Sequence, residues 1–120
     1  MRGGELVQLT RDHSLLEEMK AVAPDMTEEQ QRSFPHKNVI TRALGMRDSV
    51  DVDLRVEPVE TGDRFLICSD GLSGMVEDPV LLEKIRAGTE LEPLVAELIA
   101  LANANGGVDN ITALVFERTG

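Results

Sequence analysis

The chain has 120 residues, with 22 acidic and 12 basic side chains and a formal net charge of −10 at pH 7. This charge argues against nucleic-acid binding, because the phosphate backbone repels an acidic protein. No apolar run approaches the roughly 18 residues of a membrane span and no signal peptide opens the chain, so we expect no membrane contact and a cytoplasmic location. The single cysteine, Cys68, cannot form an internal disulfide and is expected to be buried and unreactive.

The first part of the chain predicts two helices between two short strands. Residues 5–9 alternate loosely between apolar and polar side chains, which favours a strand. The ranges 14–21 and 27–33 each open with a capping-box sequence, S-L-L-E and T-E-E-Q, and are predicted to be helices. Residues 39–44 form a short apolar stretch stopped by Gly45, which indicates a second strand.

The middle of the chain predicts an antiparallel hairpin. Apolar and polar side chains alternate regularly over 51–57, so this range is predicted to be a strand with one buried face, ended by Pro58. The run R-F-L-I-C-S over 64–69 is nearly continuous in apolarity, which predicts a strand buried on both faces. We expect these two strands to pair across a turn at 60–63.

The last part of the chain predicts two helices before a final strand. The range 78–87 begins with Asp-Pro, which is typical of a helix with Asp78 as its cap. Apolar residues recur at three- and four-residue spacing over 91–102, which predicts a long amphipathic helix capped from Thr89 or Glu92. The order of elements predicts an α+β fold, an antiparallel sheet with helices on one face.

Two acidic residues stand where an apolar run meets a loop. Asp70 follows the run 64–69 within S-D-G-L, and Asp109 precedes the run 111–116 within G-G-V-D-N-I-T. Two carboxylates held at neighbouring strand ends repel each other unless a cation lies between them. We therefore predict that Asp70 and Asp109 bind a hard divalent metal. The alternative is a helix cap and a turn residue without a metal, whereas an EF-hand calcium loop is not expected because its pattern is absent.

Four ordered motifs carry a resemblance to a known family. They are L-T-R-D-H-S at 9–14, N-V-I-T-R-A-L-G at 38–45, G-D-R-F-L-I-C-S-D-G at 62–71 and G-G-V-D-N-I-T at 106–112. In this order they resemble motifs of the metal-dependent serine/threonine protein phosphatases of type 2C, and of the bacterial branch above all. The D-G-x-G-type metal motif, the phosphate-binding arginine and the G-D-S-type strand of the family's first half are not in this sequence. The resemblance therefore implies a C-terminal half, a single partial domain over 1–120 with a flap-like helical segment at 14–37.

The resemblance also implies a chemistry and a set of site residues. Enzymes of this family use two Mn²⁺ or Mg²⁺ ions and metal-activated water to hydrolyse phosphoserine and phosphothreonine in proteins. By resemblance, Asp70 reaches both ions and Asp109 binds one. Gly106 and Gly107 shape the loop before Asp109, Asn110 supports Asp109 through its amide, and Gly71 is a supporting residue beside Asp70. The family's site also takes an aspartate and a glycine carbonyl from its first half, so we expect catalysis by this chain alone to be incomplete.

The family's fold is an α-β-β-α sandwich, of which this chain resembles roughly half. We therefore expect an apolar sheet face that pairs with a missing N-terminal half or with a second copy of the chain. The alternative function is a non-catalytic protein-interaction module or a pseudophosphatase fragment.

Three basic side chains are also considered as site residues. Arg42 is expected to form a salt bridge within the fold in preference to facing an anionic substrate or the acidic rim. His13 and His36 lack a second histidine at ligand spacing, so we do not assign either of them to catalysis.

Overall fold

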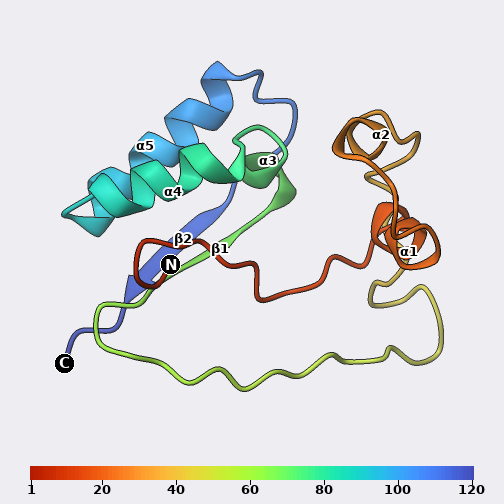
Figure 1. The fold of residues 1–120 in the computed structure, drawn as a ribbon, viewed down its shortest axis with the longest axis horizontal. Helices are drawn as coiled ribbons and strands as arrows, with labels where there is room; N and C mark the ends of the chain where they lie inside the picture. The colour runs from red at the N-terminus through yellow and green to blue at the C-terminus, as the bar shows by residue number, and fades with distance from the viewer. The chain divides into compact units, whose positions relative to one another are not determined.

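The computed structural model describes all 120 residues of the chain (Figure 1). They form two compact units, one made of Met1–Val7 with Glu57–Gly120 and the other of Gln8–Val56. The first unit is an antiparallel two-stranded sheet with helices, so the predicted α+β class is confirmed.

The sheet of the first unit is built from strands that are distant in sequence. Strand β1 (Arg64–Cys68) pairs antiparallel with β2 (Ala113–Glu117), and Cys68 lies opposite Ala113. Side chains alternate between the two faces of each strand, and one face packs against the hydrophobic core. The half-buried members on that face are Leu66, Cys68, Ala113 and Val115.

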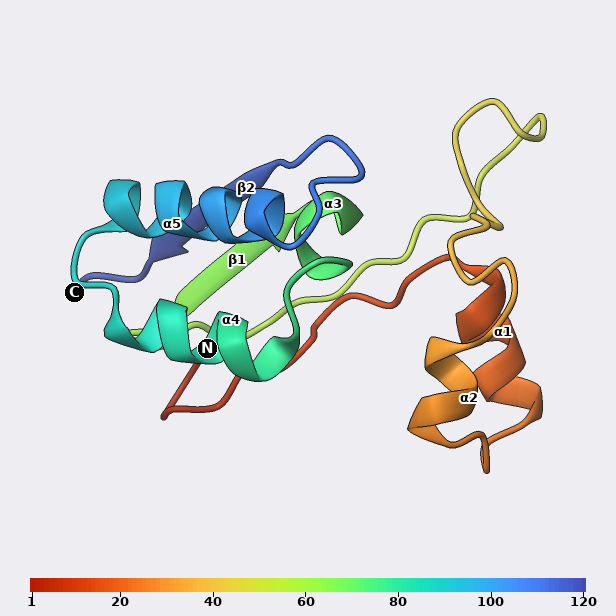
Figure 2. The same ribbon diagram turned by 90° about the horizontal axis from the view of Figure 1, so that it is seen from above.

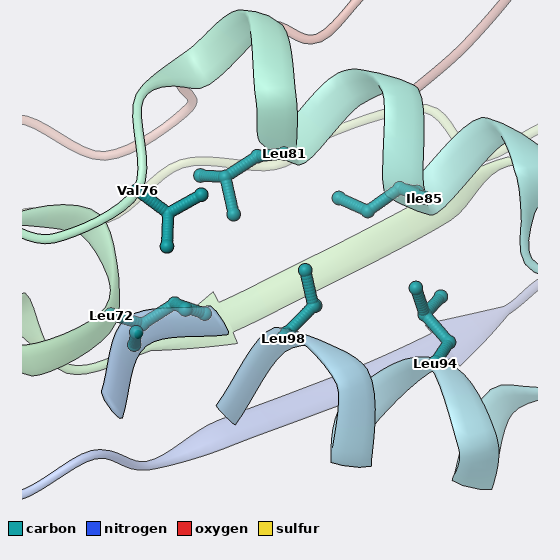
Figure 3. Packing of buried hydrophobic residues seen from close by; sticks show 7 residues of the cluster. Leu72, Val76, Leu81, Ile85, Leu94 and Leu98 are labelled. Atoms are coloured by element: carbon teal, nitrogen blue, oxygen red, sulfur yellow. The ribbon is translucent and has the colours of Figure 1, made fainter. Parts of the chain in front are cut away.

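Three helices complete this unit. Helix α3 (Asp70–Ser73) follows β1 directly, and α4 (Asp78–Ala87) and α5 (Leu91–Ala104) come next. Helices α4 and α5 lie side by side over the same face of the sheet (Figure 2). Leu81 and Ile85 of α4 point toward Leu94 and Leu98 of α5, with the strands behind them (Figure 3). The fully buried core is small and aliphatic, and consists of Leu72, Val76, Leu81, Ile85, Leu94, Leu98 and Ala102.

The caps of the two longer helices differ from the sequence prediction. Helix α4 is capped by Glu77, and Asp78 is already its first helical residue. Helix α5 is capped by Glu90 and not by Thr89 or Glu92. Neither glutamate makes a side-chain cap hydrogen bond. The proline near the start of α4 does occupy the first turn, where its missing N–H costs no intrahelical bond.

The second unit contains the two predicted N-terminal helices. Helix α1 (Leu15–Val22) begins after Ser14, whose hydroxyl accepts a hydrogen bond from the backbone N–H of Glu17. Helix α2 (Glu28–Arg32) begins with a complete capping box in which Thr27 and Gln30 bond each other's backbone N–H. Both helix starts were predicted from these local sequences and are confirmed.

The three other predicted strands are not formed. Within the ranges 5–9, 39–44 and 51–57 the structure has only isolated bridges, between Arg2 and Glu5 and between Ser14 and Ile40. The predicted hairpin is also wrong, because β1 pairs with β2 and residues 51–57 form no strand. A strand needs a neighbouring strand for its backbone hydrogen bonds, and none in this chain is placed beside these segments.

A buried ion pair joins the N-terminal segment to the start of β1. Asp63 is only 3% exposed and accepts hydrogen bonds from Nε and Nη2 of Arg2 at 2.8 and 2.6 Å. It also accepts one from the backbone N–H of Glu60 at 2.7 Å. These donors, Arg2 first, lower the pKa of Asp63 to about 2. The charged form of Asp63 therefore stabilises the folded chain.

We expect this ion pair to make the fold sensitive to acid. The folded pKa of Asp63 lies below its unfolded value of about 4, so its stabilisation is complete above pH 4 and is lost as the pH falls toward 2. Thermal unfolding of the wild type and of Asp63→Asn between pH 7 and pH 2 tests this. The wild type should be the more stable protein at pH 7, and the gap should close below pH 4. A gap that stays constant down to pH 2 would contradict the assignment.

Candidate metal site at two strand ends

Asp70 lies at the C-terminal end of β1, in a position that the local structure fixes. The strand ends at Cys68, Ser69 is the N-cap residue of α3, and Asp70 is the first residue of that helix. The Asp70 side chain is exposed, whereas the next two residues, Gly71 and Leu72, are buried. The carboxylate therefore stands in solvent on a backbone that is held by the core on its other side.

Asp109 lies in the loop that leads from α5 into β2. Gly106 and Gly107 follow the helix with φ values of +136° and +53°, a region that L side chains rarely adopt, and the N–H of Gly107 bonds the carbonyl of Ala102. Asp109 is exposed, and its Oδ1 accepts a hydrogen bond from the backbone N–H of Asn110 at 2.7 Å. The contact thus comes from the Asn110 backbone and uses one of the two carboxylate oxygens.

The segments that carry the two aspartates are bonded to each other. The N–H of Ser69 donates to the carbonyl of Thr112 at 3.0 Å, and the Ser69 hydroxyl both accepts from the N–H of Thr112 at 3.0 Å and donates to the carbonyl of Asn110 at 3.2 Å. A Cβ added to Gly71 would stand 2.1 Å from the Asn110 carbonyl oxygen, so only glycine allows this approach. The residue after Asp70 therefore contacts the residue after Asp109.

This arrangement gives the chain two exposed carboxylates on adjoining backbone segments. Carboxylate oxygens are the ligand type that Mg²⁺ and Mn²⁺ prefer, and Mg²⁺ keeps several waters while using only one or two of them. No group of three or more acidic, histidine or cysteine side chains is placed to hold a metal ion. The residues present fit a hard divalent ion in their chemistry, but they supply only part of a coordination shell.

Ser69 and Thr112 support the candidate site, and the sequence analysis did not single them out. Both flank the motif aspartates, and their hydrogen bonds hold the two segments in register beyond the end of the β1–β2 ladder. The available signal was a hydroxyl residue directly before an Asp-Gly pair, which is common at helix N-caps. That signal did not indicate a partner 43 residues away.

The basic residues discussed from the sequence lie in the second unit. Nη1 of Arg42 contacts Oδ1 of Asp53 at 3.0 Å, so the predicted internal salt bridge is confirmed. Nε2 of His13 lies 2.7 Å from Oδ2 of the same aspartate. The His13 ring, followed by Arg42, lowers the pKa of Asp53. This cluster ties together the segments before and after helices α1 and α2.

Comparison with known proteins finds relatives among bacterial phosphatases. The chain is 41% identical over 113 residues to the serine/threonine phosphatase Stp of Listeria monocytogenes. The alignment covers 94% of this chain and 44% of that protein. It is 39% identical over 117 residues to a putative 2C-type protein phosphatase of Streptococcus pyogenes, which covers 97% of this chain and 47% of the relative. The chain is related to one half of a type 2C serine/threonine phosphatase.

Comparison with solved structures shows that the similarity to phosphatases extends to the three-dimensional fold. The superposition on the S. agalactiae serine/threonine phosphatase covers 97% of this chain and 48% of the phosphatase chain, with a TM-score of 0.86 and 41% sequence identity. The Mycobacterium tuberculosis phosphatase PstP/Ppp matches 99% of this chain and 49% of its own with a TM-score of 0.89 and 35% identity. A structure of the PstP catalytic domain with two manganese ions matches 99% of this chain with a TM-score of 0.78 and 33% identity.

The chain spans about half the length of the type 2C relatives it matches. No family model matches it. No helix of the chain has the length and apolarity that crossing a membrane requires.

Proposed function

We propose that this chain supplies the Asp70 and Asp109 part of a metal-dependent protein phosphatase site. The observation that carries the proposal is the junction itself, where Gly71 packs against the Asn110 backbone and Ser69 bonds both Asn110 and Thr112. The kinship with type 2C serine/threonine phosphatases supports a phosphoserine or phosphothreonine protein as the substrate.

Each residue of the junction has a distinct part in this proposal. Asp70 and Asp109 hold Mn²⁺ or Mg²⁺ through carboxylate oxygens, and the backbone N–H of Asn110 fixes the orientation of the Asp109 carboxylate. Gly71 lets the two loops approach without a side chain between them, and Gly107, with a φ of +53°, lets the backbone turn tightly past Asn103 at the end of α5. A bound divalent ion neutralises phosphate oxygens and lowers the pKa of water toward neutrality.

Full activity requires further ligands from outside the chain. Two carboxylates alone bind a divalent ion weakly, because water must provide the rest of the coordination shell. We propose that two ions bind in the complete site, as in the PstP structure that contains two manganese ions. We also propose that residues 14–37, which include α1 and α2, act as a flap segment of a single phosphatase domain.

Metal titration of the chain tests the proposed site. Mn²⁺ is paramagnetic, so we expect it to broaden the NMR amide signals of Gly71 and Asn110 before those of other residues. Asp70→Asn and Asp109→Asn should each weaken Mn²⁺ binding at least about 10-fold, since each removes one of only two charged ligands. Asp78→Asn, which changes another exposed aspartate of the same unit, is the matched control and should bind Mn²⁺ as the wild type does.

Uniform broadening over the whole acidic surface, unchanged by either substitution, would contradict the site. It would favour the second candidate function, a non-catalytic interaction module. The observation that favours this second function is the exposed apolar face of the β1–β2 sheet, where Ile67 is 62% and Leu114 is 52% exposed.

A further inference from the structure

The loop that carries Asp109 is tied to the segment that carries Asp70 by an asparagine side chain. Nδ2 of Asn105 donates a hydrogen bond to the backbone carbonyl of Met75 at 2.8 Å. Asn105 is the C-cap residue of α5, and Met75 lies two residues after the end of α3. The loop after α5 passes beside α3 in both views of the ribbon (Figure 1, Figure 2). This contact is separate from the junction at the two strand ends.

The backbone conformation of Asn105 does not itself require asparagine. Asparagine is favoured at the ends of helices where φ is positive, but Asn105 has a φ of −83° and a ψ of 4°, which most residues adopt. The positive φ values come only afterwards, at Gly106 and Gly107. The specific contribution of Asn105 is therefore its side-chain amide, which bonds a segment 30 residues away.

Met75 offers this amide a well-held acceptor. Its side chain is half-buried and packs against the hydrophobic core, next to the fully buried Val76. A Cβ placed on Gly106 would stand 3.6 Å from Sδ of Met75, which is an ordinary van der Waals distance. The start of the Asp109 loop thus rests on Met75 through both a hydrogen bond and close packing.

The other end of the loop is held by Ser69. Ser69 and Thr112 continue the register of β1 and β2 by one pair, and the Ser69 N–H donates to the Thr112 carbonyl at 3.0 Å. In an antiparallel pair of this kind the Thr112 N–H returns a bond to the Ser69 carbonyl. That carbonyl instead accepts from the N–H groups of Leu72 and Ser73, at 3.1 and 3.4 Å, and the Ser69 hydroxyl takes its place. The chain can therefore turn into α3 without losing its bond to β2.

The two contacts bracket the loop from Asn105 to Thr112. Between them, Gly106 and Gly107 have no side chains that fix the direction of the loop, although their N–H groups bond carbonyls at the end of α5. With the Ser69 contact alone, the loop can pivot about its far end. Contacts at both ends of the segment 69–75 fix the position and the direction of the loop that carries Asp109.

We propose that Asn105 is a positioning residue for the proposed metal site. Its amide holds the start of the Asp109 loop against the segment that follows Asp70, so that the two carboxylates have a fixed separation before an ion binds. Residues that orient metal ligands without touching the metal contribute to metal affinity. The inference rests on the proposed function for the importance of this separation, but the tie itself is a property of the metal-free chain.

Amide hydrogen exchange without metal tests the tie. Asn105→Asp keeps the shape of the side chain but removes the Nδ2 donor. The N–H of Gly107, which bonds the Ala102 carbonyl, should exchange about 3- to 10-fold faster, the range that one net hydrogen bond corresponds to. Asn38→Ala, which truncates an exposed asparagine of the second unit, is the control and should leave this rate unchanged. An unchanged rate in Asn105→Asp would overturn the proposal.

Mn²⁺ titration of the folded chain tests the effect on the site. Asn105→Asp adds a negative charge near the loop, which by electrostatics alone strengthens the binding of a cation. We expect the opposite, a Mn²⁺ affinity about 3- to 10-fold weaker than that of the wild type. A purely structural role would lower the stability in urea without weakening Mn²⁺ binding by the folded chain. That result, or an affinity equal to or above the wild type, would overturn the positioning role.

The wild type separates this inference from the proposed function. Selective broadening at Gly71 and Asn110 in the wild type, with unchanged affinity in Asn105→Asp, removes the positioning role and leaves the metal site in place. If the wild type shows no selective broadening, the proposed function fails. The positioning role for a metal then fails with it, even if the exchange of Gly107 confirms the tie.

Discussion

Replacing Leu98 with alanine should lower the free energy of unfolding of the first unit by about 2–5 kcal/mol. Leu98 has no exposed surface and lies between α4 and the sheet in a core of only seven fully buried residues. Truncation removes the transfer free energy of the buried atoms and leaves a cavity. Leu94 and Ile85 are anchored on helices on either side, so they cannot collapse fully into the space.

Urea unfolding followed by circular dichroism at the helical minimum measures this loss. Val108→Ala is the matched control, because it also deletes apolar atoms but from a side chain that is 76% exposed. The control should change the free energy of unfolding by less than about 0.5 kcal/mol. A Leu98→Ala protein with wild-type stability would show that the packing of α5 on α4 and the sheet contributes little to the fold.

The helices of this chain could be predicted because their signals are local. The Ser14 and Thr27 caps act on backbone groups within three residues, and the apolar spacing of α5 is read along one segment. The strand at 51–57 had an equally clear pattern but is not formed. The alternation of apolar and polar residues shows that one face of the segment could be buried, but it does not show which strand would lie beside it. The chain places no strand beside this segment.

The candidate site was only partly accessible from the sequence for a similar reason. The motifs placed Asp70 and Asp109 at the ends of apolar runs, and the structure brings their neighbours into contact through the Ser69 hydroxyl and the close approach at Gly71. The antiparallel register of β1 with β2 creates this contact, and the sequence analysis had paired β1 with another segment. The motif residues could thus be identified from their residue types and from the order of the motifs along the chain. The hydrogen bonds that support them depend on which strands pair, and this could not be predicted.

Gly71→Ala should both destabilise the fold and weaken metal binding, although it changes no ligand. The added methyl would stand 2.1 Å from the Asn110 carbonyl oxygen and 2.9 Å from its carbonyl carbon, so the α3 turn and the Asp109 loop must separate. Overpacking of this kind costs about 1–3 kcal/mol. Because the same loops carry Asp70 and Asp109, we expect at least a 10-fold loss of Mn²⁺ affinity together with shifted amide signals at Asn110 and Ile111.

Ser73→Ala supplies the control within the same helical turn. Ser73 is exposed at the end of α3, so alanine there removes no buried contact and should leave both stability and Mn²⁺ binding unchanged. The two readouts also separate the causes, since urea unfolding reports the packing conflict and Mn²⁺ broadening reports binding of the ion. If Gly71→Ala loses stability but keeps its Mn²⁺ affinity, the two aspartates do not act together on one ion. The proposed metal site would then have to be abandoned.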